Sequence, residues 1–481
     1  MGTASRKCAA EWILILGLLS CAGTAAAAPS RAEMDLAVRD LDADHERATA
    51  ALYALQSGGA PAARAIEDAW PSLSMLGQRR AVGALRTLSQ AHDAAVEALV
   101  AAARSEDDQV RQLALAALGQ SGRRGRKGLV TLLADPRVGG RAASTLARTD
   151  PDSAITPLLA AIRAEDGAER PALRDALGVA VQRAKAPGPK LYGWLKTEPP
   201  AAAVASAALG FSAIEERRAE VASFVAYAAL GSTDFATSWR LLQSAGAAAP
   251  SVPVDRWVAT QLAEPEEWML RAAAVDAVTA RGGREHARAS LSDPYPRVRA
   301  RAATALSGDP TSLLTRATLA RRDTWPIVRA AAVQSLRTEP DALPVILASV
   351  DDSMSVVRVA AIEVLTSAPH DEGWDRIHRR LRAANEWPNV TAAAIEYVAA
   401  HCRTDAAESL FRVVLRASPS HALTEDLNNA ARAIEALRAL GTPEANAVID
   451  RLRATPEVPP TLQMALEQPL RDDRECAAPG S

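Results

Sequence analysis

The chain is poor in the residues that build β-sheets and disulfide-stapled folds. Its 481 residues include four Phe, five Tyr and four Cys, and aromatic residues make up only 4%. No stretch alternates Val, Ile or Thr with polar residues as a half-buried strand would. Four cysteines are too few for a disulfide scaffold, and none has zinc-site spacing. These scarcities exclude a β-rich fold and leave alanine-rich helices that can approach one another closely.

Positive charge is not in excess either. The 55 Lys and Arg residues are balanced by 57 Asp and Glu, for a net charge of −2. Phosphate binding needs a positive excess on at least one face, so we expect no nucleic-acid partner. The single basic run, Arg123 to Lys127, is expected to form a solvated loop between two helices.

The familiar catalytic motifs are missing as well. No G-x-S-x-G, Walker-type loop or H-E-x-x-H occurs, which predicts a protein without catalytic residues, metal or cofactor. The densest polar cluster is His370-Asp371-Glu372 with Asp375 and His378. On a helix starting near Asp371, Asp375 and His378 would share a face and could bind a metal or act as acid and base. The competing interpretation is that the two acids at 371 and 372 cap a helix N-terminus.

The first residues have the pattern of a secretory signal peptide. Two basic residues precede an apolar run from Trp12 to Leu19, well short of the roughly 20 residues that a bilayer core requires. Leu18 to Gly23 resembles a bacterial lipobox, which would make Cys21 a lipidated N-terminal residue and a membrane anchor. Cleavage near Ala27, with release of the chain, is the alternative.

One helical pattern repeats four times in the middle of the chain. Each copy fits V-R-x-x-A-x-x-[ASV]-[LV], with Leu in first place in the first copy. Positions one, five, eight and nine share one stripe of an α-helix. The copies start 28, 30 and 29 residues apart, a period that indicates stacked units burying their faces against one another. The copies are Leu270–Val278, Val298–Leu306, Val328–Leu336 and Val357–Leu365.

The first residue of each copy is its anchor, and the same stripe continues outward to about twelve helix pairs. Several prolines stand two residues before an anchor, where the first position of a helix tolerates them. The further anchors are predicted near Gly77, Val110, Val138, Leu173, Ala201, Phe235 and Val390, with a degenerate unit around Ala433.

The segment from Asp293 to Arg299, followed by Ala302 and Leu306, resembles the HEAT repeat in the short form named after phycobilisome lyases. The resemblance covers residues 60–455, strongly in 264–400 and loosely near 205–260. It implies an all-α, right-handed α-solenoid of about twelve helix pairs, roughly 28–35 residues each, used mainly for protein–protein contact. It implies no activity, because such repeats occur in unrelated proteins.

Arginine follows the anchor in each clear copy, and an acid precedes most of these anchors by five residues. That spacing places a carboxylate in the turn between the two helices of a unit, within reach of a repeated arginine. We expect a structural ladder and not a row of catalytic arginines. Its members are Arg271, Arg299, Arg329, Arg358, Asp293, Asp323 and Asp352.

Large apolar residues recur three residues before four anchors, where this repeat type often has a capping Asp. The four are Tyr295, Trp325, Met354 and Trp387. Because each copy repeats the position, they should follow one edge of the solenoid. One interpretation is a hydrophobic staple or packing against the next unit. The other is a docking site for a protein partner, since Trp, Tyr and Met are enriched at interfaces.

The predicted organisation has five parts: a signal peptide at 1–28, a capping helix at 29–60, repeats at 61–260 and 261–455, and a C-terminal cap with a disordered tail at 456–481. Cys402 and Cys476 could pair, but the sequence does not fix their distance. We expect an exported, lipid-anchored scaffold of the bacterial cell envelope, periplasmic or at the outer membrane. The alternative is a metal-dependent or lyase-related enzyme on the same scaffold.

Overall fold

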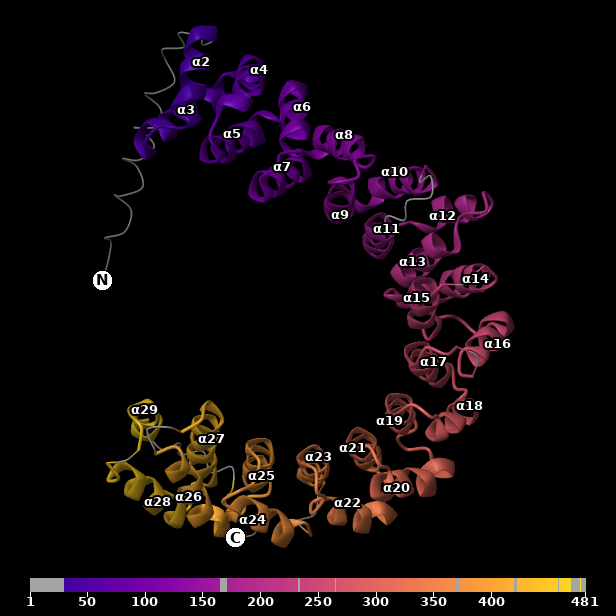
Figure 1. Cartoon of the computed structure of the whole chain (residues 1–481), viewed down its shortest axis with the longest axis vertical. Helices are drawn as coiled ribbons and strands as arrows, with labels where there is room; N and C mark the ends of the chain where they lie inside the picture. The colour runs from indigo at the N-terminus through magenta and orange to yellow at the C-terminus, as the bar shows by residue number, and fades with distance from the viewer. Residues whose placement is uncertain are drawn as a thin grey trace, which may run out of the picture. The chain divides into compact units, whose positions relative to one another are not determined.

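The computed structural model describes residues 30–164, 171–231, 234–263, 265–368, 372–418, 422–456, 458–468 and 476. The chain divides into two compact units, Met1–Ile214 and Glu215–Ser481. The 28 α-helices assigned in the described ranges pack against the next or the next-but-one helix in the chain, and short 3-10 turns join some of them (Figure 1). The predicted all-α fold of consecutive helix pairs is confirmed.

In unit 1, alternate helices follow one another in two rows (Figure 1). The first row is α5 (Met75–Leu88), α7 (Asp108–Gln120), α9 (Gly139–Thr149), α11 (Pro171–Arg183) and α13 (Ala201–Ser212). The second is α4 (Gly59–Ala69), α6 (Asp93–Ala102), α8 (Gly122–Leu132), α10 (Pro151–Arg163) and α12 (Gly188–Leu195). Before them come α2 (Arg31–Asp40) and α3 (His45–Ser57).

Unit 2 repeats this alternation. Its first row is α15 (Phe235–Ala245), α17 (Trp268–Ala280), α19 (Pro296–Ala305), α21 (Pro326–Ser335), α23 (Ser355–Thr366), α25 (Pro388–Ala400) and α27 (Thr424–Leu440). The helices between them are α14 (Arg218–Ala229), α16 (Val252–Thr260), α18 (Arg284–Ala289), α20 (Leu313–Arg322), α22 (Leu343–Ser349), α24 (Trp374–Arg382), α26 (Ala407–Arg416) and α28 (Pro443–Arg453). The described helices end with α29 (Pro460–Glu467).

The stripe predicted for the four clear copies forms the core of unit 2. The anchors Val298, Val328 and Val357 are fully buried, and so are the alanines four residues after them. Leu306, at position nine of its copy, is also fully buried. In contrast, Arg301 at position four is exposed. The helical phase inferred from the repeat is therefore the phase of the fold.

The predicted anchors fall in, or at the N-cap of, the odd-numbered helices from α5 to α27, but Ala201 and Phe235 each stand two residues before the buried residue of their helix, Ala203 and Thr237. Asp234 caps α15 by accepting a hydrogen bond from the Thr237 N–H at 2.9 Å. The third residue after the cap, Thr237, is therefore the buried one, and Phe235 is exposed. Phe235 resembles an anchor in the sequence because it is large and apolar, but it occupies the first position of the helix.

Two further expectations differ from the structure. The segment 29–60 holds two helices, α2 and α3, because Asp44 accepts the Arg47 N–H at 3.0 Å and starts a second helix after Leu41. The basic run lies inside α8 and not in a loop. Its Gly125 packs so closely that an added Cβ would lie 1.8 Å from the Leu118 carbonyl oxygen. That glycine serves close helix packing and not a turn.

Several predictions fall outside the described residues. They are the signal peptide, the lipobox with Cys21, and most of the C-terminal tail. Among the residues described, no helix is both long and apolar enough to cross a membrane. Cys476 is described, and it forms a disulfide with Cys402 at the end of α25, with the two Cα atoms 5.4 Å apart.

Candidate functional site

The four large residues before the anchors each stand at the N-cap of a first-row helix. Tyr295, Trp325, Met354 and Trp387 precede α19, α21, α23 and α25, and their exposed fractions are 37%, 54%, 46% and 62%. Trp325 and Trp387 are thus more than half exposed, and Tyr295 is the least exposed of the four. The exposure of the two tryptophans does not fit packing against the next unit, whereas the Tyr295 ring stacks on Trp268 of the preceding repeat.

The N–H groups of three of these N-cap residues are bound by acids two residues earlier in the chain. Asp293 accepts the Tyr295 N–H at 2.7 Å, and Asp323 accepts the Trp325 N–H at 2.9 Å. Asp352 does the same for Met354 at 2.8 Å. In α19 and α21 a proline occupies the first helical position and has no N–H to satisfy. The N-cap side chain is consequently free to be apolar.

The arginine after each anchor bonds to the acid of the next repeat. Arg271 lies 2.8 Å from Asp293, Arg299 lies 2.8 Å from Asp323, and both pairs use two nitrogens and two oxygens. Arg329 and Asp352 repeat this geometry at 2.8 Å. Such bidentate pairs combine energy with geometric specificity. Each such pair therefore links one repeat to the next.

Each of these arginines also binds the turn that precedes its own helix. The Arg299 guanidinium donates to the carbonyl oxygens of Asp293 and Pro294, at 2.8 and 3.1 Å. Arg271, Arg329 and Arg358 make the equivalent pair of bonds. One guanidinium therefore fixes both its own inter-helix turn and the acid of the following turn.

The fourth pair of the ladder ends on a residue that the sequence pattern did not single out. Arg358 bonds to Glu386 at 2.5 Å, and the same carboxylate accepts the Trp387 N–H at 2.9 Å. Glu386 stands four residues before its anchor and not five. Its longer side chain reaches the place that the aspartates occupy, which a search for Asp at one spacing could not find.

The pKa values in the ladder follow from this pairing. Hydrogen bonding to Asp293 raises the pKa of Arg271, and bonding to Asp352 raises that of Arg329. Burial alone would raise the pKa of Asp352. The hydrogen bonds from Arg329 and from the Met354 N–H outweigh it, so this pKa is lowered. Both shifts in the Arg329–Asp352 pair favour the charged forms.

Further apolar residues extend the exposed edge. Ile327 and Val356, each one residue before an anchor, are 46% and 45% exposed. Trp268, at the start of α17, stacks on Tyr295 with ring centroids 4.7 Å apart, and Arg297 lies over the same indole. The apolar ridge is defined here as Trp268, Tyr295, Trp325, Ile327, Met354, Val356 and Trp387.

The polar cluster proposed as a metal or acid–base site does not come together in the described residues. His370 and Asp371 lie outside them, and Asp375 is exposed. His378 stacks on Trp374 at 4.5 Å, and its Nε2 lies 2.8 Å from the Ser409 hydroxyl. Burial lowers the pKa of this imidazole. No group of three potential metal ligands occurs in the described part of the chain.

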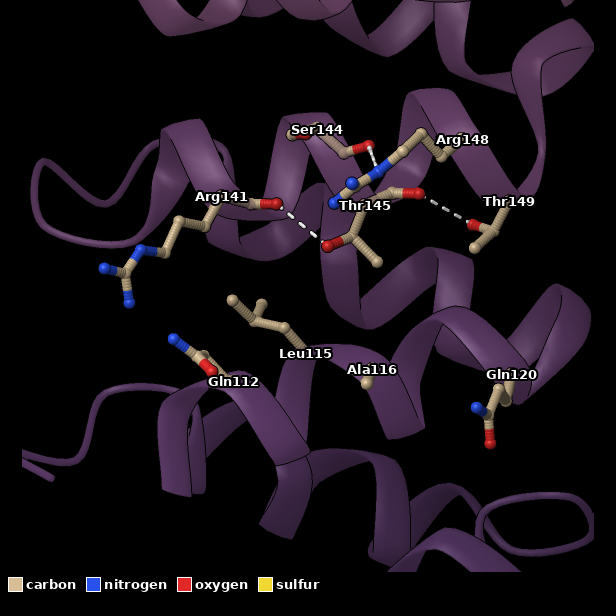
Figure 2. A pocket seen from close by; sticks show the side chains of 9 residues that line it. All are labelled: Gln112, Leu115, Ala116, Gln120, Arg141, Ser144, Thr145, Arg148 and Thr149. Atoms are coloured by element: carbon tan, nitrogen blue, oxygen red, sulfur yellow. Dashed lines mark hydrogen bonds between the residues drawn. The ribbon is translucent and has the colours of Figure 1, made fainter. Parts of the chain in front are cut away.

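A groove of about 490 Å³ lies between α7 and α9 in unit 1 (Figure 2). Its two threonine hydroxyl groups bond within their own helix, Thr145 to the Arg141 carbonyl oxygen at 2.9 Å and Thr149 to that of Thr145 at 2.9 Å. Arg141 in turn pairs with Asp108 at 2.5 Å. The groove thus directs few groups at a ligand, and the apolar ridge is the stronger candidate.

No protein-family profile matches the chain, and no curated protein sequence matches it. Among solved structures, a Kap121p variant matches with a TM-score of 0.48 and 12% identity, over 88% of this chain and 55% of that one. Kap121p bound to Pho4p gives 0.45, 13%, 90% and 53%. The Kap95:Nup1 complex gives 0.41, 14%, 89% and 63%. The chain spans little more than half the length of the Kap121p structures.

These similar structures are HEAT-repeat α-solenoids. The assignment of this chain to an all-α solenoid rests on its own helix pairs, described above. The short phycobilisome-lyase subtype stays a prediction from the repeat sequence, as does the absence of catalysis.

Proposed function

We propose that the protein is a non-catalytic α-solenoid scaffold that binds a protein partner along the apolar ridge. The observation that supports this proposal is the exposure of Trp325 and Trp387 at the N-cap position, where α5 and α7 of unit 1 have the polar caps Ser74 and Asp107. Exposed apolar patches on soluble proteins mark interaction sites, and Trp and Tyr dominate binding energy at interfaces. The ladder beneath holds the backbone of each N-cap in place, so the ridge is presented by rigid elements.

We further propose that the protein is exported and anchored by a lipid on Cys21. The N-terminal sequence pattern supports export. The bond between Cys402 and Cys476 is consistent with it, because such bonds persist in oxidising compartments. Mass spectrometry of the mature protein should find a lipidated N-terminus at Cys21. A soluble product beginning near Ala28 would contradict the anchor and leave export intact.

The docking proposal is tested by replacing Trp325 and Trp387 with Ala together. The matched control is Tyr53→Ala, an aromatic residue of unit 1 that is 71% exposed and lies outside the ridge. Because both tryptophans are largely in solvent, we expect the double variant to melt close to the wild type. Each lost hot spot should weaken partner binding by at least about 2 kcal/mol, or roughly thirtyfold.

The measurement combines thermal melts with quantitative affinity capture of envelope proteins by the three forms of the full chain. Proteins kept by wild type and Tyr53→Ala but lost by the double variant are the expected result. An unchanged set of captured proteins, together with a loss of stability of about 3–5 kcal/mol per tryptophan, would instead make the aromatic groups internal packing.

A further inference from the structure

Exposed arginines flank the apolar ridge. Arg321 and Arg322, in the last turn of α20, come just before Trp325, and Arg382 ends α24 just before Trp387. All three are exposed, and none forms a salt bridge with another described residue. The acids of the ridge backbone cannot neutralise them, because the ladder arginines already bind those carboxylates.

The edge that bears the ridge therefore has a positive charge, although the chain as a whole does not. Segments 293–299, 319–329, 349–358 and 379–390 together hold nine arginines and five acids, whereas the whole chain has a net charge of −2. A basic residue in the last turn of a helix also stabilises the helix dipole. That role needs one cation per helix and no neighbouring tryptophan, so it does not account for the clustering at Trp325 and Trp387.

The positive charge has a definite distribution along the ridge. It is concentrated beside Trp325 and beside Trp387. Between them, around Met354, the charges are paired: Asp351 binds Arg376 and Arg380, and Asp352 binds Arg329. The exposed residues in this middle part are aliphatic: Ile327, Met354 and Val356. The surface thus presents two basic positions separated by an apolar stretch.

We propose that the partner segment bound by the ridge is an extended polypeptide with two acidic positions on either side of an apolar stretch. This inference rests on the proposed function and names the class of partner for the same edge. Trp325 and Trp387 are two repeats apart, which is about 16–20 Å if adjacent helices lie about 8–10 Å apart. An extended chain covers that distance with about five or six residues.

The chemistry of the ridge favours a polypeptide over other anions. A nucleic acid has a continuous row of phosphates, but Asp351 and Asp352 already engage the arginines in the middle of the ridge, so that part offers the phosphates no unpaired cation. Ile327, Met354 and Val356 offer no flat ring on which a base could stack, whereas they suit aliphatic side chains. Complementary charges at two separate positions also set the register of a bound segment.

The test measures binding of three synthetic peptides to the full chain by fluorescence anisotropy. The peptides share one central stretch of Leu and Trp, and they differ only at both ends, which carry Glu, Gln or Lys. We expect the Glu peptide to bind at least about tenfold more tightly than the Gln peptide, with the Lys peptide weakest. Added salt should weaken the Glu peptide most.

The variants are Arg321→Glu with Arg322→Glu, Trp325→Ala with Trp387→Ala, and the control Tyr53→Ala. The charge reversal should remove the preference for the Glu peptide, and the tryptophan pair should weaken all three peptides. Thermal melts identify any variant that fails to fold. Arg321→Gln with Arg322→Gln, which removes the charge without adding a new one, is the second form of the charge test.

The results separate the two proposals. If the three peptides bind equally and all depend on the tryptophans, the acidic partner is wrong and the protein-binding ridge stands. If no peptide binds, or none depends on the tryptophans, the acidic segment is also wrong, and the ridge itself is then judged by the capture experiment. Tighter binding of oligo-dT or of phosphatidylglycerol vesicles, with the same dependence on the arginines and tryptophans, would show that the ligand is not a polypeptide.

Discussion

Helices α7 and α19 begin in the same register but with opposite chemistry. In unit 1, α7 starts after Asp107, three residues before its buried anchor Val110, and the Asp107 carboxylate accepts the Val110 N–H at 2.8 Å. In unit 2, α19 starts after Tyr295, three residues before Val298, with no side-chain cap. The same position of the repeat is a conventional polar cap in α7 and a partly exposed aromatic group in α19.

The difference is explained by where each region places its acid. Asp107 caps its helix and pairs with Arg79 of the preceding repeat at 2.9 Å, so one residue does both tasks. In unit 2 the acid has moved two residues toward the N-terminus, to Asp293, where it binds Arg271 and the N–H of the cap residue. Moving the acid keeps the connection between repeats and frees the cap position for an apolar side chain.

The cores of the two regions should respond alike, and this gives the largest expected effect. Leu118 in α7 and Leu306 in unit 2 occupy position nine of their repeats and are fully buried. Leu118→Asp and Leu306→Asp should each cost several kcal/mol, because each buries an unpaired charge. Arg301→Asp, which breaks an exposed pair with Asp276, should cost no more than about 1 kcal/mol. Urea unfolding measures all three, and equal midpoints for Leu306→Asp and Arg301→Asp would contradict the helical phase.

The connections between repeats should differ in strength. Arg329 and Asp352 are mostly buried and bidentate, whereas Arg104 and Asp135 in unit 1 meet through one contact at 3.0 Å with Arg104 half exposed. Arg329→Ala leaves Asp352 without its partner and should cost about 3 kcal/mol. Arg104→Ala should cost at most about 1 kcal/mol. Similar losses for the two variants, measured by unfolding of the full chain, would mean that the ladder is no stronger than a surface ion pair.

The sequence was sufficient for the core and for most of the ladder because both repeat at a fixed period. Buried valine and alanine recur every 28 to 30 residues, so each copy supports the assignment of the others. Bidentate pairing has a fixed geometry, and it therefore leaves Arg and Asp at constant offsets from the anchor. Such features are strictly periodic, and periodic features can be found without a structure.

The features that the sequence did not reveal depend on contacts without a fixed spacing. Glu386 stands one residue later than the aspartates of the other repeats, and its longer side chain reaches the same position to bind Arg358. Trp268 is part of the ridge because its ring stacks on Tyr295 of the next repeat. Gly125 looked like a loop residue, yet it serves a close contact with Leu118. The exposure of the ridge residues also had to come from the structure, because a staple and a docking surface have the same sequence pattern.

The smallest expected effect tests whether the N-cap position in unit 2 has an apolar residue, in place of a polar cap, because the ridge binds a partner. Asp107→Ala in unit 1 removes a cap together with the ion pair to Arg79, and it should cost about 1–2 kcal/mol. Met354→Asn in unit 2 adds a cap. Met354 has the extended backbone of a usual N-cap, with φ −102° and ψ 129°. An Asn side-chain oxygen at this position would accept an N–H of the first turn of α23. We expect Met354→Asn to raise stability by about 0.5–1 kcal/mol and to weaken peptide binding, because it removes an apolar contact from the middle of the ridge.

Met354→Ala, which removes the contact without adding a cap, is the matched control and should weaken binding with a change in stability within about 0.5 kcal/mol. Unfolding and anisotropy on the same samples measure both quantities. A loss of stability in Met354→Asn would show that methionine is held there by packing, and that the two regions differ for a reason other than binding.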